Sequence, residues 1–403
     1  MGSRSYKEGF DKSPMPHDNS PVMRFLSYLG YLAIPLAYIV HYLIGHGKSW
    51  EPVTTFALAG VGVIPLAKLM GESTESLTEH AGPTWGGLLN ATFGNAAELI
   101  IAFIAIHKGL NDIVRATLTG SILGNLLLVA GAAMIAGGWN REKQTFSRAA
   151  AEINAGMLVM AVAAMLFPAI YHITYHWGAG GFTEKEHSLS SGTSVVLLIV
   201  YALGLLFTLR THAHLFTRAP AQHEEDPIRG ISGVHGEVWS VRKSVTILLI
   251  ASVAIGFISE LLVGSAEEMS KHLGWNHTFV GVILLAIIGN AAEHSTAILL
   301  ARRNDMDTAM TITYQSSLQI ALFAVPFLVL SSAVMVWLQI GHAQYLDLVF
   351  TPMEVVSVIL SVAIVVVLNM DGQTNWFEGV LLLALYAILG IEFFYIPTGA
   401  HAG

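Results

Sequence analysis

The sequence predicts an all-α membrane protein with about eleven transmembrane helices. Hydrophobic residues make up 54% of the 403 residues, and charged residues make up only 12%. The charged share is about half of the roughly 25% found in soluble domains, whose cores do not need so much apolar sequence. Eleven stretches approach the roughly 20 apolar residues that a helix needs to cross a bilayer. They cover residues 24–45, 53–75, 84–107, 112–138, 148–173, 189–210, 243–263, 276–301, 307–338, 348–369 and 375–397.

Composition also removes several classes of function. The chain has no cysteine, which excludes disulfides and thiolate metal sites. Its formal net charge of −8 is small for this length and does not suggest a nucleic-acid partner. The sequence contains no His-Glu-x-x-His motif, so an intramembrane metalloenzyme is not expected. We therefore expect neither an enzyme nor a resident cofactor.

The basic residues predict how the chain lies in the membrane. With the N-terminus on the cytoplasmic side, 15 Lys and Arg fall at the inner ends of the predicted helices and 5 at the outer ends. This bias fits the positive-inside rule and an odd number of spans. The polar stretch 211–240 lies on the inner side, and we interpret it as a cytoplasmic linker, either a plain solvated loop or an acidic cation-sensing patch. The expected division is an N-terminal tail at 1–23, a first helix at 24–45, and two halves at 46–210 and 241–403.

An internal repeat relates the two halves. Gly94-Asn95-Ala96-Ala97-Glu98 recurs as Gly289-Asn290-Ala291-Ala292-Glu293, an offset of 195 residues. The same offset aligns Ser121 with Ser316 without a gap. The motifs lie in the third and eighth predicted helices, an odd number of spans apart, so these helices cross the membrane in opposite directions. In transporters, inverted repeats of this kind place a binding site near the middle of the membrane.

Glu98 and Glu293 are the predicted centre of function. A charged side chain at the bilayer centre costs about 2.5–3.5 kcal/mol. Two such side chains at repeated positions are therefore expected to have a function. Carboxylate, amide and hydroxyl oxygens are the ligands that Ca²⁺ prefers. Two carboxylates balance one divalent cation, and two protons neutralise the empty site equally well, so we expect the same oxygens to bind either. The expected ligands are Glu98 and Glu293 for the metal, with Asn95, Asn290, Ser121, Asn125, Gln315, Ser316 and Gln319 around them.

Other interpretations of these residues stay open. The Gly-Asn-Ala-Ala stretches alone are also typical of small-residue packing between membrane helices, although packing does not account for two glutamates. Glu75 and Glu260 are expected at the ends of the second and seventh helices, near opposite faces, where they would relay protons or gate the entrances. The alternative for this pair is two ordinary solvated helix ends. His294 follows Glu293 directly and is a candidate for tuning the choice of ion, although adjacent helix residues point to different faces.

The paired motifs resemble the Ca²⁺/H⁺ (cation/proton) exchanger family of the calcium/cation antiporter superfamily. The resemblance rests on residues 86–100, 120–125, 289–294, 316–323 and 371–379, and extends over roughly residues 50–396. It implies one extra N-terminal helix followed by two inverted five-helix repeats that work by alternating access. Ile320 stands where the repeat aligns Asn125, which favours protons over sodium. The resemblance implies Glu98 and Glu293 as the central cation and proton ligands, supported by Asn95, Ser121, Asn290, Ser316 and Gln319.

The expected function is therefore exchange of Ca²⁺ for H⁺ by a multi-pass membrane protein. Its expected partners are Ca²⁺, protons and the lipid bilayer. A sodium-coupled or broader divalent-cation exchanger is the alternative, and a channel would need a filter repeated around a pore axis. The expected location is a prokaryotic inner membrane or a vacuolar-type membrane, with the oligomeric state left open.

Overall fold

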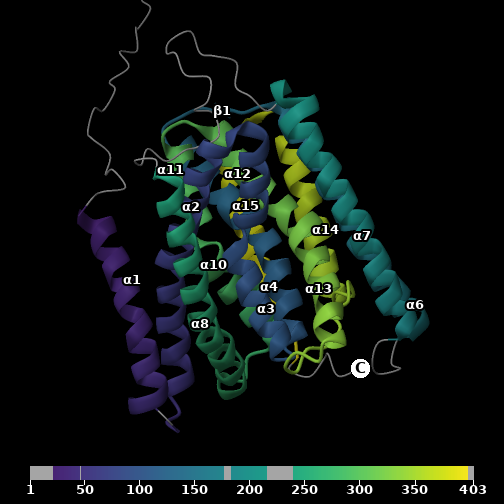
Figure 1. Cartoon of the computed structure of the whole chain (residues 1–403). Coiled ribbons are helices and arrows are strands. Elements are labelled where there is room, and N and C mark those ends of the chain that lie inside the picture. The colour runs from purple at the N-terminus through teal and green to yellow at the C-terminus, as the bar shows by residue number, and fades with distance from the viewer. Residues whose placement is uncertain (1–20, 46, 177–182, 216–238, 398–403) are drawn as a thin grey trace, which may run out of the picture.

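The computed structural model describes residues 21–45, 47–176, 183–215 and 239–397. The described chain is almost entirely helical, and its helices run alongside one another between two ends (Figure 1). Two short strands, β1 (Gln144–Thr145) and β2 (Gln373–Thr374), pair antiparallel at one end, which we call the sheet end. The opposite end, which we call the loop end, carries the connection 338–351. The expected tail at 1–23 and linker at 211–240 lie almost entirely outside the described residues.

The helices follow one another along the chain, and short π-helical turns continue several of them. They are α1 (Pro21–Ile39) with η1 (Val40–Ile44), α2 (Glu51–Phe93), α3 (Ala96–His107), α4 (Asn111–Leu123) with η2 (Gly124–Val129) and α5 (Ala130–Gly138), α6 (Arg148–His176), α7 (Glu184–Leu206) with η3 (Phe207–Thr211), the 3₁₀ turn η4 (Ala213–Leu215), α8 (Val241–Leu273), α9 (His277–Phe279) with η5 (Val280–Leu285) and α10 (Ala286–Gly289), α11 (Ala291–Arg302), α12 (Met306–Gln319) with η6 (Ile320–Ala324) and α13 (Val325–Trp337), α14 (Pro352–Asn369) and α15 (Trp376–Phe394).

Nine helical stretches of the described chain are long and apolar enough to cross a membrane, and a bent pair, 277–289 with 291–302, raises the number to ten. The chain is therefore a multi-pass membrane protein, although the predicted count of eleven is not reached by this criterion. The predicted second and third helices follow one another without a loop, because the helical backbone of α2 is interrupted only by a kink at Gly82, where φ is 77°. Glycine adopts a positive φ at little cost, so the chain bends there without a loop. α3 is then only 12 residues long.

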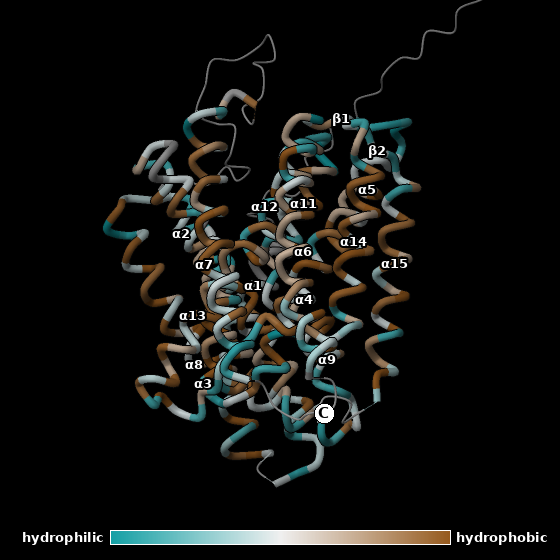
Figure 2. Tube along the Cα trace, turned by 90° about the vertical axis from the view of Figure 1, so that its right-hand side faces the viewer, coloured by the Kyte–Doolittle hydropathy of each residue, from teal (hydrophilic) through white to brown (hydrophobic). Residues whose placement is uncertain are grey.

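The helix formed by α4, η2 and α5 is more deeply buried than the other spans of the described chain. Within its most apolar window 83% of the residues are buried, against 50% or less elsewhere. α1 lies at the side of the bundle against α2 (Figure 1) and leaves large apolar side chains such as Leu32 and Leu43 exposed. Figure 2 shows hydrophobic residues along the outer helices and hydrophilic residues in the connections. This distribution is that of a bundle surrounded by lipid.

The helices that follow the two motifs run in opposite directions, as the repeat predicts. α3 ends at the loop end, where the His107 carbonyl accepts a hydrogen bond from the His342 N–H (2.8 Å). α11 ends at the sheet end, where Gln144 Nε2 donates to the Ala301 carbonyl (3.4 Å). Each motif therefore begins a helix near the middle of the bundle and points it toward a different end.

The sheet end and the loop end should face opposite sides of the membrane. We expect Glu142→Cys, in the sheet-end connection, to react with an impermeant maleimide from the cytoplasmic side only. We expect His342→Cys, in the loop-end connection, to react only from the other side. Both parent residues are exposed, and the chain has no cysteine to give a background signal. Labelling of both positions from one side would contradict this arrangement.

Candidate cation-binding site

Each repeated motif interrupts a helix at its glycine and asparagine. The break between α2 and α3 falls at Asn95, with φ −103° and ψ 26°. The break between α10 and α11 falls at Asn290, with φ −92° and ψ 6°, and the helix bends there by 62°. Gly94 and Gly289 come directly before these residues and weaken the helix at both points. Interrupted helices of this kind carry ion sites inside membrane transporters.

Glu98 and Glu293 lie in the first turn of the helices that restart after the breaks. A helix N-terminus carries partial positive charge, which stabilises a nearby carboxylate by about 0.3–1 kcal/mol, or more when the group is partly buried. Glu98 is 5% exposed, and Glu293 is half-buried. Glu98 lies against the second motif, because its Cγ would be 3.5 Å from a Cβ atom added to Gly289, although the two motifs are far apart in the sequence. The fold thus brings the two predicted glutamates to one place.

A chain of two hydrogen bonds leads to Glu293. Asn125 Nδ2, in η2, donates to Ser316 Oγ (2.8 Å), and Ser316 Oγ donates to Glu293 Oε2 (2.6 Å). The amide occupies one acceptor position of the hydroxyl, so the single hydroxyl proton is directed to the carboxylate. The sequence predicts Asn125 as a cation ligand, whereas its amide nitrogen here orients Ser316. The remaining lone pair of Ser316 Oγ is left for a cation.

Two further hydrogen bonds, each donated by a side-chain amide, join the two halves of the chain. Asn290 Nδ2 donates to Ser121 Oγ (2.9 Å), and Asn95 Nδ2 donates to Gln319 Oε1 (2.5 Å). Like the bond from Asn125, each of these crosses from one half of the chain to the other. The polar residues that the sequence predicts around the glutamates therefore form three separate hydrogen-bonded groups, each of which contains residues from both halves.

The side-chain carbonyl oxygens of Asn95 and Asn290 have no hydrogen-bond partner among the described residues. Asn95 Oδ1 and Asn290 Oδ1 are buried and accept no hydrogen bond from the part of the chain that the structure describes. An unpaired buried acceptor costs about 1–3 kcal/mol, so these oxygens indicate a ligand that uses them. Together with two carboxylates and two hydroxyls they suit a hard divalent cation, which takes about six to eight oxygens.

Among the described residues, no group of three or more His, Cys, Asp or Glu side chains is placed to hold a metal ion. Glu98 and Glu293 are the two carboxylates of the candidate ligand set, and two carboxylates are enough to balance one divalent charge.

The motif glycines also leave room for polar side chains of the opposite half. A Cβ atom on Gly289 would lie 3.5 Å from Cγ and 3.6 Å from Oε1 of Glu98. A Cβ atom on Gly94 would lie 3.5 Å from Gln319 Oε1. A methyl group would only touch these atoms, whereas a larger side chain would displace them. Each glycine therefore serves both the helix break and the close approach of the other motif.

His294 lies against the buried helix formed by α4, η2 and α5. It is buried, and its Nε2 has no hydrogen-bond partner among the described residues. A Cβ atom on Gly124 would lie 3.9 Å from the ring atoms Cε1 and Nε2. The ring thus faces the start of η2, next in sequence to Asn125. A role for His294 in ion choice stays a prediction.

Glu75 and Glu260 are not at helix ends, contrary to expectation. α2 continues past Glu75 to the kink at Gly82 and beyond, and α8 continues past Glu260 to Leu273. Glu75 is half-buried and Glu260 is exposed. The expected ends were placed too early because polar residues inside a long helix resemble the end of a span. A relay or gating role for this pair stays a prediction.

Two buried contacts beside the site were not predicted. Asn369 Nδ2 donates to Tyr314 OH (2.8 Å), and Thr119 Oγ1 donates to Glu354 Oε1 (3.4 Å). The repeat offset aligns Thr119 with Tyr314, each two residues before a site serine, and both contacts reach α14. The alignment of two polar residues was the signal in the sequence that would have found them.

Comparison with known proteins places this arrangement in a family. The model of the family described as sodium/calcium exchanger protein matches residues 52–210 and 243–394. The chain belongs to the sodium/calcium exchanger protein family. The residues of this exchanger that lie between the two matched ranges contain the predicted linker.

Relatives of this exchanger are similar over nearly its whole length. A "Ca(2+)/H(+) antiporter" of Aphanothece halophytica is 42% identical over 91% of this chain and 97% of its own. A "vacuolar calcium ion transporter" of Schizosaccharomyces pombe is 40% identical over 91% of this chain and 85% of its own. The solved structure of native YfkE has a TM-score of 0.74 at 36% identity and covers 92% of this chain and 100% of that chain.

The packing of Glu98 against Gly289 in this exchanger can be tested by side-chain size. We expect Gly289→Ala to keep cation binding and Gly289→Val to weaken it by about tenfold or more, because valine enters the space that the Glu98 carboxylate fills. Binding of ⁴⁵Ca²⁺ to the purified protein measures the effect. Gly256→Val is the matched control, since nothing lies within 4 Å of a Cβ atom added there. Unchanged binding by Gly289→Val would contradict the observed packing.

Proposed function

We propose that the protein exchanges Ca²⁺ for H⁺ across a membrane through one site that holds either the cation or protons. The observation that carries this proposal is the convergence of two carboxylates from the paired motifs with two unpaired asparagine oxygens. The printed names of the Aphanothece halophytica and Schizosaccharomyces pombe relatives support this choice of ions. The exchange needs no resident cofactor and no covalent step, so we propose a transporter rather than an enzyme.

Charge balance explains why the same residues hold either ion. When both are ionised, Glu98 and Glu293 place two negative charges in a bilayer interior, where uncompensated charge is costly. One Ca²⁺ or two protons neutralise them, so both loaded forms are balanced and the empty ionised form is not. The empty form is therefore disfavoured, and the protein releases one kind of ion as it takes up the other. Ser316 serves both states, because its proton bonds to Glu293 while its oxygen remains available to a cation.

We further propose that α1 is an extra helix and that two inverted five-helix repeats follow it. In this scheme α2 before Gly82 is one pass, and the rest of α2 together with α3 is the next, which gives the eleven passes predicted from the sequence. The opposite directions of α3 and α11 support this assignment. The N-terminus and the sheet end are then cytoplasmic, and Glu98 and Glu293 are reached alternately from the two sides.

Glu75 and Glu260 fit this scheme as candidates for a proton relay or a gate. They lie on α2 and α8, which pack against each other along the bundle. If the two helices shift relative to each other, the carboxylates are carried with them toward different sides. Substitution of both by glutamine should slow exchange without changing equilibrium Ca²⁺ binding, and a loss of binding would instead place them in the site.

A sodium-coupled or broader divalent-cation exchanger is the alternative. Ile320 is fully buried at the position that the repeat aligns with Asn125, so the second half offers one polar group fewer for additional ions. Uptake of ⁴⁵Ca²⁺ into proteoliposomes with an imposed pH gradient, with and without sodium, separates the two. We place the protein in a prokaryotic inner membrane or a vacuolar-type membrane, and the name of the Schizosaccharomyces pombe relative fits the second.

Removing either titratable carboxylate should abolish exchange. We expect Glu98→Gln and Glu293→Gln each to reduce pH-driven ⁴⁵Ca²⁺ uptake by about 100-fold or more, because glutamine keeps the shape but neither titrates nor balances the cation. Glu392→Gln is the control, since Glu392 is exposed on α15. Size-exclusion chromatography and thermal unfolding show whether the variants remain folded. Near wild-type uptake by either variant would exclude the two-carboxylate site.

Protons and Ca²⁺ should compete. The apparent Ca²⁺ affinity should fall with falling pH, by about tenfold per pH unit where one proton is displaced and about 100-fold where two are. Calorimetry across about pH 5.5–8.5, in buffers of different ionisation enthalpy, counts the protons released. Glu98→Gln should flatten the pH dependence of any binding that remains, because one titrating partner is gone. Ca²⁺ binding with no proton release would contradict proton exchange and favour the sodium-coupled alternative.

A further inference from the structure

Histidine–carboxylate pairs gather at the loop end of the bundle. In each, a buried carboxylate oxygen lies 2.6–2.7 Å from the Nδ1 of a partly exposed imidazole. The described ion pairs at the sheet end use arginine or lysine instead, as in Arg148–Glu152. A partner that titrates near neutral pH is thus found at one end of the described chain. The pairs are His41–Glu51, His172–Glu186 and His187–Asp347.

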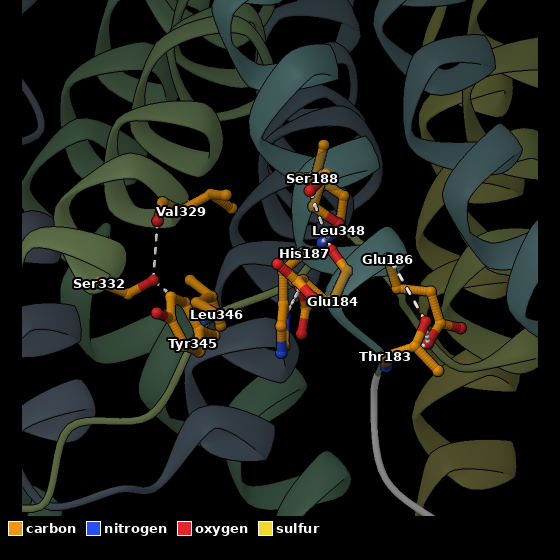
Figure 3. A network of polar contacts seen from close by, with 12 residues as sticks. Thr183, Glu184, Glu186, His187, Ser188, Val329, Ser332, Tyr345, Leu346 and Leu348 are labelled. Carbon is orange, nitrogen blue, oxygen red and sulfur yellow. Dashed lines mark hydrogen bonds and ion pairs between the residues drawn. The ribbon is translucent and has the colours of Figure 1, made fainter. Parts of the chain in front are cut away.

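Asp347 belongs to the connection 338–351, and its partner His187 lies on α7 next to that connection (Figure 3). The His187 ring stacks on Tyr345, with ring centroids 4.5 Å apart. On either side of Asp347, the N–H groups of Leu346 and Leu348 donate to serine hydroxyls of α13 and α7 (2.9 and 3.0 Å). The connection is therefore held to the bundle on both sides of a carboxylate that is only 2% exposed.

Asp347 has an oxygen to which a proton can bind. Oδ1 pairs with His187, whereas Oδ2 is buried without a hydrogen-bond partner among the described residues. Burial raises the pKa of the Asp347 carboxyl, while the His187 hydrogen bond and the charges of His187 and Arg115 act in the opposite direction. A group whose pKa is raised in the closed state favours that state at low pH, and this preference is lost as pH rises through the raised pKa.

The charges around the pair leave it short of positive charge. Arg115 on α4 acts on Asp347 but also pairs with Asp112 (2.6 Å). Glu186 is a second buried carboxylate that acts on Asp347, and its own partner is His172 on α6. With both imidazoles neutral, the three carboxylates outweigh Arg115 by two charges, and two protons bring this set to neutrality.

We propose that His187 and Asp347 form a second proton-binding site, separate from the exchange site, and that a proton bound there keeps the loop end closed. The proton is taken from solvent on the loop side, where the His187 side chain is 26% exposed. The charged neighbours on α7, Glu184 and Lys185, are exposed and already hydrated. Closure is therefore expected to strengthen on acidification of that side and to weaken when it becomes alkaline.

The closed connection also restrains the helix that carries Ser121 and Asn125. Asn111, the first residue of α4, donates its Nδ2 to the Tyr345 carbonyl in the same connection (2.9 Å). The repeat aligns Arg115 with Met310, so α12 has no such charge near its sheet end. Opening at the loop end is then coupled to proton loss in a way that opening at the sheet end is not. This consequence for transport rests on the proposed exchange, whereas the proton site itself does not.

Hydrogen–deuterium exchange of the full chain in nanodiscs tests the proton site without any transport. The reporters are the amides of Leu346 and Leu348, whose exchange requires local release of the connection. After correction for intrinsic rates, we expect their protection in the wild type to rise by about tenfold between pH 8 and pH 5, as a charge-assisted or neutralised pair replaces a bare buried carboxylate. Protection that does not change with pH in the wild type would overturn the proposal, whatever the variants do.

Variants assign the effect to the pair. His187→Gln keeps a donor but leaves only Asp347 to titrate, and Asp347→Asn keeps the size but leaves only His187 to titrate, so each should weaken the pH dependence of protection. His342→Gln, an exposed histidine of the same connection, should behave as the wild type. An unchanged pH dependence in a folded His187→Gln or Asp347→Asn protein would contradict the assignment.

Measurements of Ca²⁺ flux test the consequence for transport separately. With the pH of the sheet side fixed, acidifying the loop side should slow turnover of the wild type. The same acidification should not slow turnover of the His187→Gln variant. If His187→Gln changes amide protection but not flux, the proton site stands and its control of exchange is excluded. If the wild type carries no pH-driven Ca²⁺ flux at all, the proposed function fails while the amide result still decides the proton site.

Discussion

Two carboxylates inside a bilayer have to be compensated whatever else the protein does, and the rest of the site follows from this requirement. Each costs about 2.5–3.5 kcal/mol if left charged and alone. Glu98 and Glu293 lie at the starts of interrupted helices, whose partial positive charge lowers this cost, and Glu293 also accepts a hydrogen bond from Ser316. The remaining deficit is what a divalent cation or two protons supply. Ion binding is thus part of what makes this interior stable.

The compensation is shared between the two halves of the chain. Asn125 orients the serine of the second half, and Asn290 bonds to the serine of the first. A relative movement of the halves therefore changes the hydrogen bonds of the site, and a change in the site alters how the halves fit. Buried hydrogen bonds exchanged between rigid helices give a small number of discrete arrangements rather than a continuous slide. This is the physical requirement for a site that opens to one side at a time.

The candidate residues of the site could be named from the sequence, although their role as ion ligands stays a prediction, and the fold could be predicted only in part. A repeated charged motif inside apolar sequence has few explanations, which is why Glu98, Glu293 and their polar neighbours could be named before the structure. The helix boundaries could not, because a single glycine with positive φ bends α2 at Gly82 without the polar loop that hydropathy looks for. The part played by Asn125 was also hidden, since composition does not tell whether an amide presents its oxygen or its nitrogen. The histidine pairs are set by tertiary contacts between residues as distant as His187 and Asp347, and no local pattern marks them.

The two ends of the bundle are built from different chemistry, although the proposed repeat would make their helices equivalent. The sheet end is joined by the pairing of β1 with β2 and by hydrogen bonds from Arg141 to the Arg302 carbonyl and from Lys143 to Gln373, whose donors keep their charge at any physiological pH. The loop end is joined in part by imidazoles and buried carboxylates, whose charge follows the solvent on that side. If the two ends respond differently to pH, access to an exchange site between them depends differently on the pH of the two solutions. In the proposed exchange through Glu98 and Glu293, the proton gradient would then also set how readily one of the two entrances opens.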